Sequence, residues 1–203
     1  MIKNIIFDIG GVLVDFIPQK VAEEKLGIPK DIASKLMEKT VNSKWWVQLD
    51  IGVISDEEII EKMIADAPEY KEYIRLFFDK GKEMLVKEFD YSKKWILDLK
   101  DRGYKVYLLS NYPKNFFNIH SKYMSFVNDV DGKVVSGFVN MIKPQPEIYK
   151  CLLEKYNLVP SECVFIDDRT DNVEAARQVG INGIQFAGYE AANNELRTMG
   201  VNL

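Results

Sequence analysis

Residues 1–15 read MIKNIIFDIGGVLVD, in which a short apolar run at residues 5–7 is followed at once by a carboxylate and two glycines. A run this short, with apolar residues on both faces, is typical of a strand buried in a parallel sheet. Asp8 would then lie at the carboxyl end of the strand, the edge where open α/β sheets bind ligands. Gly10 and Gly11 would allow a tight turn and a close approach of a ligand to the backbone. Aspartate and glycine also end strands for structural reasons alone, so this stretch by itself leaves both interpretations open.

Three more groups of polar residues occur along the chain, each at or just after an apolar run that predicts a strand. They are Ser110-Asn111 after residues 106–109, Lys143-Pro144 after Ile142, and Asp167-Asp168 after residues 164–166, with Asp171 and Asn172 close behind. Together with Phe7-Asp8 they resemble, in order, the four motifs of the haloacid dehalogenase-like (HAD) hydrolase superfamily.

This resemblance covers nearly the whole chain, and four ordered motifs are far more specific than any one of them. The segment FDIGGVLVD, residues 7–15, is most similar to the branch that contains bacterial sugar-phosphate phosphatases active on glucose 1-phosphate. That branch borders the dehalogenases and the N-terminal domains of soluble epoxide hydrolases.

From Tyr91 onward the chain alternates between apolar runs and amphipathic helical patterns, which predicts an α/β fold. The expected strands are 105–109, 164–166 and 184–186, with short edge strands marked by Val134, Val135, Phe138 and Val139. The expected helices are 92–102, 147–156 and 190–199. A further helix is expected before 184–186, with Asp171 or Asn172 as its cap and Gly180 as its end. With the resemblance, this predicts a Rossmann-like, doubly wound core with a mostly parallel sheet.

Residues 18–86 show apolar residues at helical spacings and no clear strand. A helical segment of about seventy residues is too long for a simple crossover. Ser55, with Glu58 three residues on, is typical of an N-cap, and Pro68 would end the helix that it opens. We interpret this segment as an inserted cap of about four helices, at the position of the HAD cap. The expected domains are therefore a core of residues 1–16 and 87–203 and a helical cap of residues 17–86.

Trp45 and Trp46 are adjacent in the expected cap. Neighbouring residues on a helix cannot both face one core. Either both tryptophans pack within the cap, which is the usual role of large aromatic side chains, or one of them lines a substrate pocket.

The composition limits the classes of partner. The chain has 203 residues, of which 47% are hydrophobic and 29% charged, and this fits one or two globular domains. A net charge of −4 gives no basic surface for nucleic acid, and no apolar stretch approaches the roughly 20 residues that span a bilayer. The short apolar run after Lys3 is not a signal peptide, and Cys151 and Cys163 are interpreted as buried thiols. These features predict a cytoplasmic protein, monomeric or homodimeric, without nucleic-acid or membrane partners.

The resemblance implies a Mg²⁺-dependent phosphatase that acts on a small phosphorylated metabolite, such as a sugar phosphate. Asp8 would attack phosphorus and form an aspartyl-phosphate. Mg²⁺, held by Asp8, the main-chain carbonyl of Gly10 and Asp168, would offset the repulsion between carboxylate and phosphate. Asp167 and Asn172, with Asp171 as a further candidate, would hold the metal's waters.

The phosphate itself would be bound by Ser110, the main-chain amide of Asn111 and Lys143. The Lys143 ammonium would stabilise the charge that develops on the phosphoryl oxygens. A lone Lys-Pro pair is otherwise typical of a surface loop, and a lone serine at a strand end is weak evidence. Two adjacent carboxylates at Asp167 and Asp168 are stronger evidence, because they repel each other unless a positive group lies nearby.

One position departs from the HAD pattern. Most phosphatases of the superfamily carry a second aspartate two residues after the nucleophile, and this chain has Gly10 there. The general acid/base that such an aspartate supplies typically contributes about a hundred- to ten-thousand-fold. Asp15, a cap residue or His120 could replace it, although His120 follows a helical pattern that suits a structural role.

Two alternative functions remain open at this stage. A dehalogenase would use the same aspartate to attack carbon without a metal, but dehalogenases replace the fourth-motif carboxylates, which this chain keeps as Asp167 and Asp168. A catalytically weak phospho-ligand-binding or regulatory protein is supported by Gly10. A dinucleotide-binding enzyme is disfavoured because no G-x-G-x-x-G follows a strand.

Overall fold

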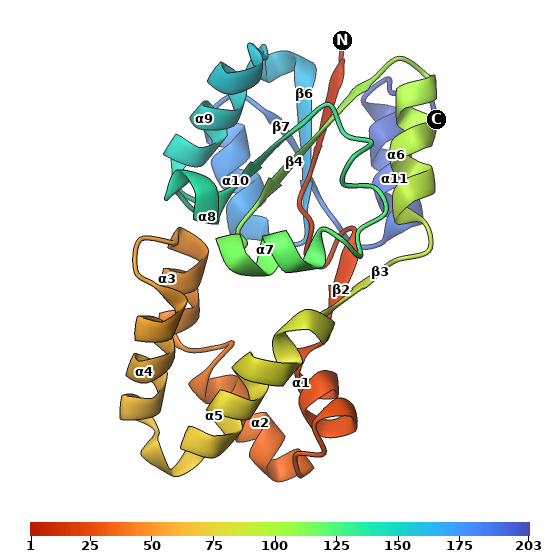
Figure 1. Ribbon diagram of the computed structural model, residues 1–203. Helices are drawn as coiled ribbons and strands as arrows, with labels where there is room; N and C mark the ends of the chain where they lie inside the picture. Colours follow the sequence, from red (N-terminus) through yellow and green to blue (C-terminus); the bar gives the residue numbers. More distant parts are fainter.

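A five-stranded parallel sheet forms the centre of the computed structural model, which describes all residues 1–203 (Figure 1). Its order is β5-β4-β1-β6-β7, and each neighbouring pair runs parallel. The strands are β1 (Asn4–Phe7), β4 (Lys105–Ser110), β5 (Gly132–Val135), β6 (Cys163–Asp167) and β7 (Asn182–Gln185). The predicted α/β fold is confirmed, and β1, β4 and β6, whose ends carry the polar groups, are adjacent.

Helices cover both faces of the sheet because successive side chains of each strand point to opposite sides. Ile5 and Phe7 belong to a hydrophobic cluster with α6 (Ser92–Asp101) and α11 (Tyr189–Thr198). Ile6 belongs to a second cluster, which it shares with α9 and α10. The remaining helices of this part are α7 (Lys114–His120), α8 (Ser136–Val139), α9 (Pro146–Tyr156), the 3-10 turn η5 (Pro160–Glu162) and α10 (Thr170–Gln178). Figure 1 shows α9 and α10 on one side of the sheet and α6 and α11 on the other, which is the doubly wound arrangement that was predicted.

The edge-strand prediction at Phe138 and Val139 was wrong. Both residues lie in the single helical turn α8 that follows β5. The Ser136 hydroxyl accepts the backbone N–H of Tyr112 at 2.8 Å, which fixes the start of this turn against the end of the neighbouring strand. The two apolar pairs Val134-Val135 and Phe138-Val139 are too short to distinguish one helical turn from a strand.

The predicted cap of α10 was also wrong. The helix begins at Thr170, and neither Asp171 nor Asn172 caps it. The Asp171 carboxylate instead accepts a hydrogen bond from the Arg169 side chain at 2.8 Å, and the Asn172 amide donates to Asp167. Asp171 also accepts the Asn172 N–H at 3.0 Å, but from within the first turn and not from the N-cap position, which Arg169 occupies.

A small antiparallel sheet connects the central sheet to the helical segment and was not predicted. β2 (Val14–Phe16) pairs with β3 (Val86–Glu88), with Asp15 opposite Lys87. The Ile17 N–H donates to the Leu85 carbonyl at 2.8 Å beyond the paired residues. Strands of three residues are too short to leave an alternating pattern. The pair holds the entry and the exit of the helical segment side by side.

The helical segment lies beyond one end of the central sheet (Figure 1). Its elements are α1 (Pro18–Lys20), the π turn η1 (Val21–Lys25), α2 (Lys30–Lys39), α3 (Lys44–Ile51), α4 (Asp56–Asp66), the 3-10 turn η2 (Pro68–Tyr70), α5 (Lys71–Leu76), the π turn η3 (Phe77–Gly81) and the 3-10 turn η4 (Lys82–Met84). The predicted N-cap is confirmed, because the Ser55 hydroxyl accepts the Glu58 N–H at 3.3 Å. None of the helices has the length and apolar character that crossing a membrane requires.

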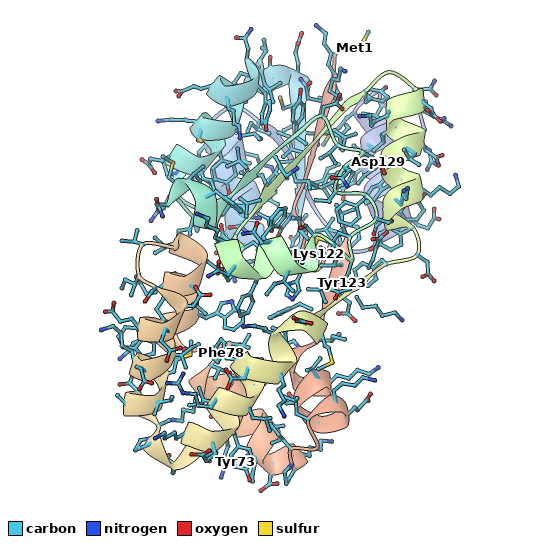
Figure 2. All side chains as sticks on the ribbon, viewed as in Figure 1. Met1, Tyr73, Phe78, Lys122, Tyr123 and Asp129 are labelled. Carbon is cyan, nitrogen blue, oxygen red and sulfur yellow. The ribbon has the colours of Figure 1, made fainter.

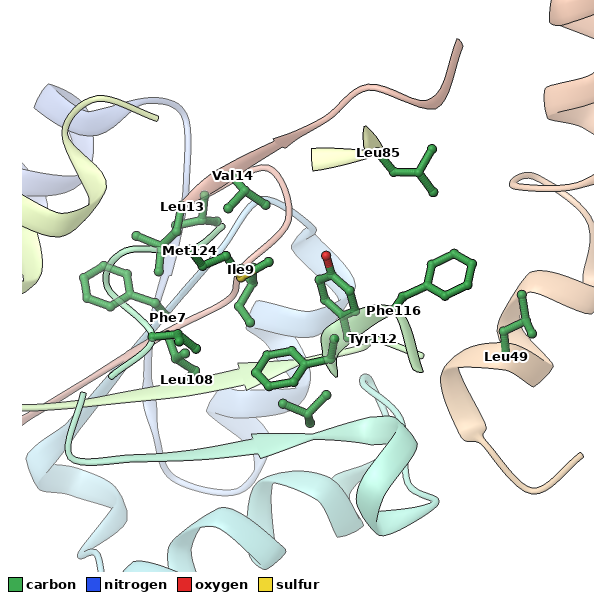
Figure 3. Packing of buried hydrophobic residues seen from close by; sticks show 14 of the residues in the cluster. Phe7, Ile9, Leu13, Val14, Leu49, Leu85, Leu108, Tyr112, Phe116 and Met124 are labelled. Carbon is green, nitrogen blue, oxygen red and sulfur yellow. The ribbon is translucent and has the colours of Figure 1, made fainter. Parts of the chain in front are cut away.

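One hydrophobic cluster runs from the sheet into the helical segment. Figure 3 shows Tyr112 and Phe116 between Phe7 of β1 and Leu49 of α3. Phe78 belongs to η3 in the helical segment and lies at the end of α5 and η3 that is nearer the sheet, as Figure 2 shows. The aromatic residues beside α7 therefore form the contact layer between the two parts of the molecule.

Candidate active site

The polar residues that follow β1, β4 and β6 meet at the carboxyl edge of the sheet, where they line a cavity of about 680 Å³. From the sheet, its walls include Asp8, Gly10, Gly11, Ser110, Asn111, Lys143, Asp168 and Asn172. From the helical segment and its connections, they include Phe16, Val41, Trp46, Val47 and Asp50. Asp167 lies behind the sheet-side wall and is fully buried. The cavity thus has a polar side at the sheet and a largely apolar side opposite.

Lys143 is the centre of the polar side. Its Nζ lies 2.9 Å from Asp8 Oδ1 and 2.6 Å from Asp167 Oδ2, and all three residues are buried. Burial alone would lower the pKa of Lys143, but the Asp8 and Asp167 carboxylates raise it above its ordinary value, so the ammonium stays charged. Lys143 is therefore not the surface residue that a lone Lys-Pro pair would suggest.

The loop that carries Lys143 is fastened by Asn111. The Asn111 side chain donates to the Lys143 carbonyl at 2.9 Å and accepts the Lys143 N–H at 2.8 Å. These two bonds fix the backbone on both sides of the lysine. The Asn111 side chain thus positions Lys143, a contact that the sequence did not reveal.

Asp167 is held from several sides. Besides Lys143, its carboxylate accepts the Arg169 N–H at 2.8 Å and the Asn172 amide at 3.0 and 3.1 Å. The Tyr149 hydroxyl in turn donates to the main-chain carbonyl of Asn172 at 2.9 Å. Asn172 Oδ1, in contrast, is buried without any hydrogen-bond partner. An unpaired buried acceptor of this kind is costly and fits a site that receives a donor from outside the protein.

Asp8, Asp167 and Asp168 form a cluster with the composition of a divalent-cation site. Each offers a carboxylate oxygen, and these oxygens lie within 4.8 Å of one another. Three carboxylates around one ammonium leave an excess of negative charge. Hard oxygen ligands and surplus negative charge are what Mg²⁺ requires.

The loop after β1 is shaped to bring Asp168 close. Gly11 has a left-handed φ of 71°, and a Cβ at this position would lie 2.7 Å from Asp168 Oδ2. Only glycine permits both the conformation and the approach. Gly10 differs, because a Cβ there would meet nothing within 4 Å.

The environment of Asp8 raises its pKa to about 7, although the Lys143 ammonium lies 2.9 Å away. Burial raises the pKa of Asp8, Lys143 lowers it, and the neighbouring Asp167 carboxylate raises it again. The Ser110 hydroxyl, at the buried end of β4, acts in the lowering direction. A further positive charge beside Asp8, such as a divalent cation, would lower this pKa and favour the ionised carboxylate.

His120 and Asp15, two sequence candidates for the missing acid/base, differ in their surroundings. His120 is buried at the end of α7, with Nδ1 bonded to the Tyr112 hydroxyl at 2.6 Å and Nε2 to the Lys82 carbonyl. Both ring nitrogens are thus engaged, and burial lowers its pKa. Asp15 borders the cavity from β2 but is exposed to solvent.

Asp50 is the cavity residue that the sequence analysis missed. It lies near the end of α3, half-buried, in the cavity that contains Asp8 and Lys143. Burial raises the pKa of Asp50 to about 7, with Lys143 lowering it and Asp8 raising it. A carboxylate in the last turn of a helix opposes the helix dipole. That unfavourable position is the one signal in the sequence that could have indicated it.

The two tryptophans have different roles. Trp46 lines the cavity, with ring centroids 5.8 Å from both Phe16 and Phe116. Trp45 faces away, because its indole N–H donates to Asp66 at 2.8 Å. Of the two interpretations offered for this pair, Trp46 fits the one that places a tryptophan at a cavity wall, and both tryptophans also pack against the hydrophobic cluster.

Comparison with known proteins identifies the class to which this fold and site belong. Residues 2–180 match the family model described as haloacid dehalogenase-like hydrolase. The chain therefore belongs to the haloacid dehalogenase-like hydrolase family, as its motifs predicted. It is 29% identical to a D-ribitol-5-phosphate phosphatase of Bacteroides thetaiotaomicron, over 91% of this chain and 92% of the relative.

Two further relatives cover nearly the whole chain. A sesquiterpene phosphatase of Aspergillus oryzae is 27% identical over 97% of this chain and 96% of its own. The crystal structure of a HAD family enzyme from Bacteroides thetaiotaomicron, an Asp-to-Ala mutant in complex with magnesium and inorganic phosphate, is 26% identical. It superposes with a TM-score of 0.74 and covers 96% of this chain and 99% of the other.

Substituting the two glycines separately tests the geometry of the loop after β1. We expect Gly11→Ala to lower the free energy of unfolding by about 1–3 kcal/mol, because the methyl group meets Asp168 and the left-handed φ strains the backbone. Gly10→Ala is the matched control and should change it by less than about 1 kcal/mol. Urea denaturation measures both, and equal losses would contradict the assignment of the close approach to Gly11.

The raised pKa of Asp50 predicts a pH-dependent cost to the folded state. In the unfolded chain the carboxyl ionises near 3.8, but in the folded protein only near pH 7. The folded state is therefore penalised progressively as pH rises between these values. In chelator-treated protein, Asp50→Asn should be more stable than the wild type at pH 8, by on the order of 1–2 kcal/mol for a half-buried, partly screened charge.

That advantage should be much smaller at pH 4, where the carboxyl is protonated in the folded state and, with an unfolded pKa of 3.8, also partly protonated in the unfolded chain. The exposed Asp31 of α2 supplies the control, since Asp31→Asn should show no comparable trend. Thermal unfolding at the two pH values measures the differences. A stability difference that does not change with pH would contradict the raised pKa.

Proposed function

We propose that this protein is a Mg²⁺-dependent phosphatase that hydrolyses small phosphate monoesters through an aspartyl-phosphate on Asp8. The observation that carries this proposal is the buried Lys143 between Asp8 and Asp167, at a cavity wall that also presents Asp168. The phosphatase names of the two curated relatives support the reaction class. The relative of known structure that contains magnesium and phosphate supports the cofactor.

The metal would be held by Asp8, Asp168 and the main-chain carbonyl of Gly10, with Asp167 and Asn172 behind them. The clustered carboxylate oxygens and the unpartnered Asn172 Oδ1 support this assignment. Bound Mg²⁺ supplies positive charge that reduces the repulsion between the attacking carboxylate and the phosphate.

The chain's own residues provide the remaining steps. Asp8 attacks phosphorus, and Ser110 and the main-chain amide of Asn111 donate hydrogen bonds to phosphoryl oxygens. Lys143 neutralises charge on those oxygens in the transition state. Its position is fixed beforehand by Asp167 and by the side chain of Asn111, so the ammonium does not have to reorganise during the reaction.

The same residues weigh against the other functions. A dehalogenase has no need for the acidic cluster, whereas Asp167 and Asp168 lie with Asp8 at one site.

We further propose that residues 17–86 act as a cap domain on a core of residues 1–16 and 87–203, joined through the β2–β3 pair. A cap of this kind would decide which leaving group fits.

The apolar side of the cavity supports a flat or apolar leaving group. Phe16, Val41, Trp46, Val47 and Phe116 line this side, with Asp50 as its single ionisable group from the helical segment. A sugar buried here would leave several hydroxyl groups unpaired, at about 1–3 kcal/mol each. The sesquiterpene phosphatase among the relatives supports this choice, and the ribitol-phosphate phosphatase supports the polar alternative.

The first test is phosphate release from a panel of esters, with Mg²⁺ and with a chelator. We expect Mg²⁺-dependent turnover by the wild type, and a loss of about three orders of magnitude or more in Asp8→Asn, because the nucleophile is removed. Asp31→Asn is the control and should retain full activity. If the protein binds a phosphate analogue but hydrolyses none of the esters, it is a phosphate-binding protein and the proposed phosphatase function is wrong.

A second test addresses the leaving group. Trp46→Ala should raise KM for geranyl phosphate about ten- to a hundredfold, because a large apolar contact is lost. KM for D-ribitol 5-phosphate should change little. Trp45→Ala removes the neighbouring indole that faces away from the cavity and should leave both values unchanged. A wild-type preference for the ribitol ester would contradict the apolar leaving group.

A further inference from the structure

The site has an unfilled place where this enzyme family usually has an acid/base side chain. Gly10 provides no such group, and nothing lies within 4 Å of the position where its Cβ would be. No neighbouring side chain from the core therefore occupies this space. A proton donor for the leaving group must reach the cavity from another part of the chain.

Only a few carboxylates line the cavity, and most have other roles. Asp8 is the proposed nucleophile, and Asp168 belongs to the acidic cluster at the metal site. Asp15 is exposed on β2, opposite Lys87. Asp50 remains, and it lies on the side of the cavity where the leaving group would be.

Asp50 is held in place by direct docking of α3 on the core. The Asn140 side chain donates to the Ile51 carbonyl at 2.9 Å, immediately next to Asp50. Gly52 then packs so closely on α8 that a Cβ would lie 2.9 Å from the Gly137 carbonyl oxygen. Gly137 in turn donates its N–H to the Tyr112 carbonyl at 3.2 Å. The carboxylate is thus fixed relative to the sheet edge rather than carried on a free helix.

The surroundings of Asp50 suit proton transfer at neutral pH. The charged and titratable groups facing it are Asp8, Lys143 and Tyr112, and Trp46 and Val47 of its own helix also line the cavity. A half-buried carboxyl whose pKa is about 7 is present in both protonation states near neutrality. An acid/base of this kind is most effective when its pKa lies near the working pH.

We propose that Asp50 is the catalytic acid/base of this site and replaces the side chain that Gly10 lacks. The inference rests on the proposed phosphatase function. As Asp8 attacks phosphorus, the bond from phosphorus to the ester oxygen breaks, and its electron pair goes to that oxygen. The oxygen takes the Asp50 proton and leaves as the alcohol. Water then attacks the phosphoryl group, Asp50 accepts a water proton, and the electron pair of the breaking bond returns to the Asp8 carboxylate.

Two esters with similar rings separate this role from others. The p-nitrophenolate ion leaves without a proton, whereas the alkoxide from p-nitrobenzyl phosphate does not. In Asp50→Asn, kcat/KM for the benzyl ester should fall about a hundred- to ten-thousand-fold, and that for the phenyl ester less than about tenfold. Asp31→Asn should leave both values unchanged.

The second half of the reaction gives an independent signal. Without Asp50 as base, hydrolysis of the aspartyl-phosphate becomes slow, although its formation from the phenyl ester does not. Rapid mixing of Asp50→Asn with p-nitrophenyl phosphate should therefore give a burst of p-nitrophenol equal to the enzyme concentration. Equal losses in kcat/KM for the two esters, or no loss with either, would overturn the proposal.

Restoring an acid at position 10 completes the test. Gly10 does not have a positive φ and has free space around it, so Gly10→Asp can be accommodated. Adding it to Asp50→Asn should recover at least about tenfold in kcat/KM for the benzyl ester. The proposal would be overturned if the double variant has the melting temperature of the wild type and cleaves p-nitrophenyl phosphate but does not regain activity on the benzyl ester. Positions 10 and 50 would then not supply the same acid/base. No hydrolysis by the wild type would instead overturn the phosphatase function itself.

Discussion

The ion pairs of Lys143 with Asp8 and Asp167 are the interaction on which this site depends. All three charges are buried, so each would be costly without the others, and removing one partner of such a pair typically costs about 3–5 kcal/mol. The strand order places β1 beside β6, which brings the two carboxylates together at the sheet edge. The lysine must then arrive from a loop, and Asn111 fastens that loop to the end of β4.

The same arrangement explains why the sequence was informative about the sheet side of the site. Short apolar runs marked the buried strands, and the carboxyl ends of neighbouring parallel strands meet at one edge. Polar residues after such runs are therefore close in space although Asp8 and Asp167 are far apart in the chain. Local errors arose where no pattern exists, as in the three-residue strands β2 and β3 and the single turn of α8. Asp171 and Asn172 resembled helix caps, but their side chains serve Arg169 and Asp167.

The opposite side of the cavity was only weakly indicated by the sequence, which offered one of the two tryptophans as a pocket residue but did not single out Asp50. Which face of a helix lines a cavity depends on how the helix docks, and docking is decided by contacts between distant segments. The bond from Asn140 to Ile51 and the approach of Gly52 to Gly137 are contacts of this kind. They orient α3 so that Trp46 and Asp50 face the sheet edge while Trp45 faces Asp66. Neither contact leaves a periodicity or a motif in the sequence.

The two sides of the cavity divide the chemistry between them. The sheet side carries the groups that act on a phosphoryl group, which is the same in every phosphate monoester. The helical side carries the aromatic wall and Asp50, and both would meet only the leaving group. With Gly10 in place of an acid in the core, recognition of the leaving group and its protonation would fall to one docked helix. Protonation of the leaving group would then require the contact between α3 and α8. An ester whose leaving group prevents this contact would still bind through its phosphate, but it would lack a proton donor.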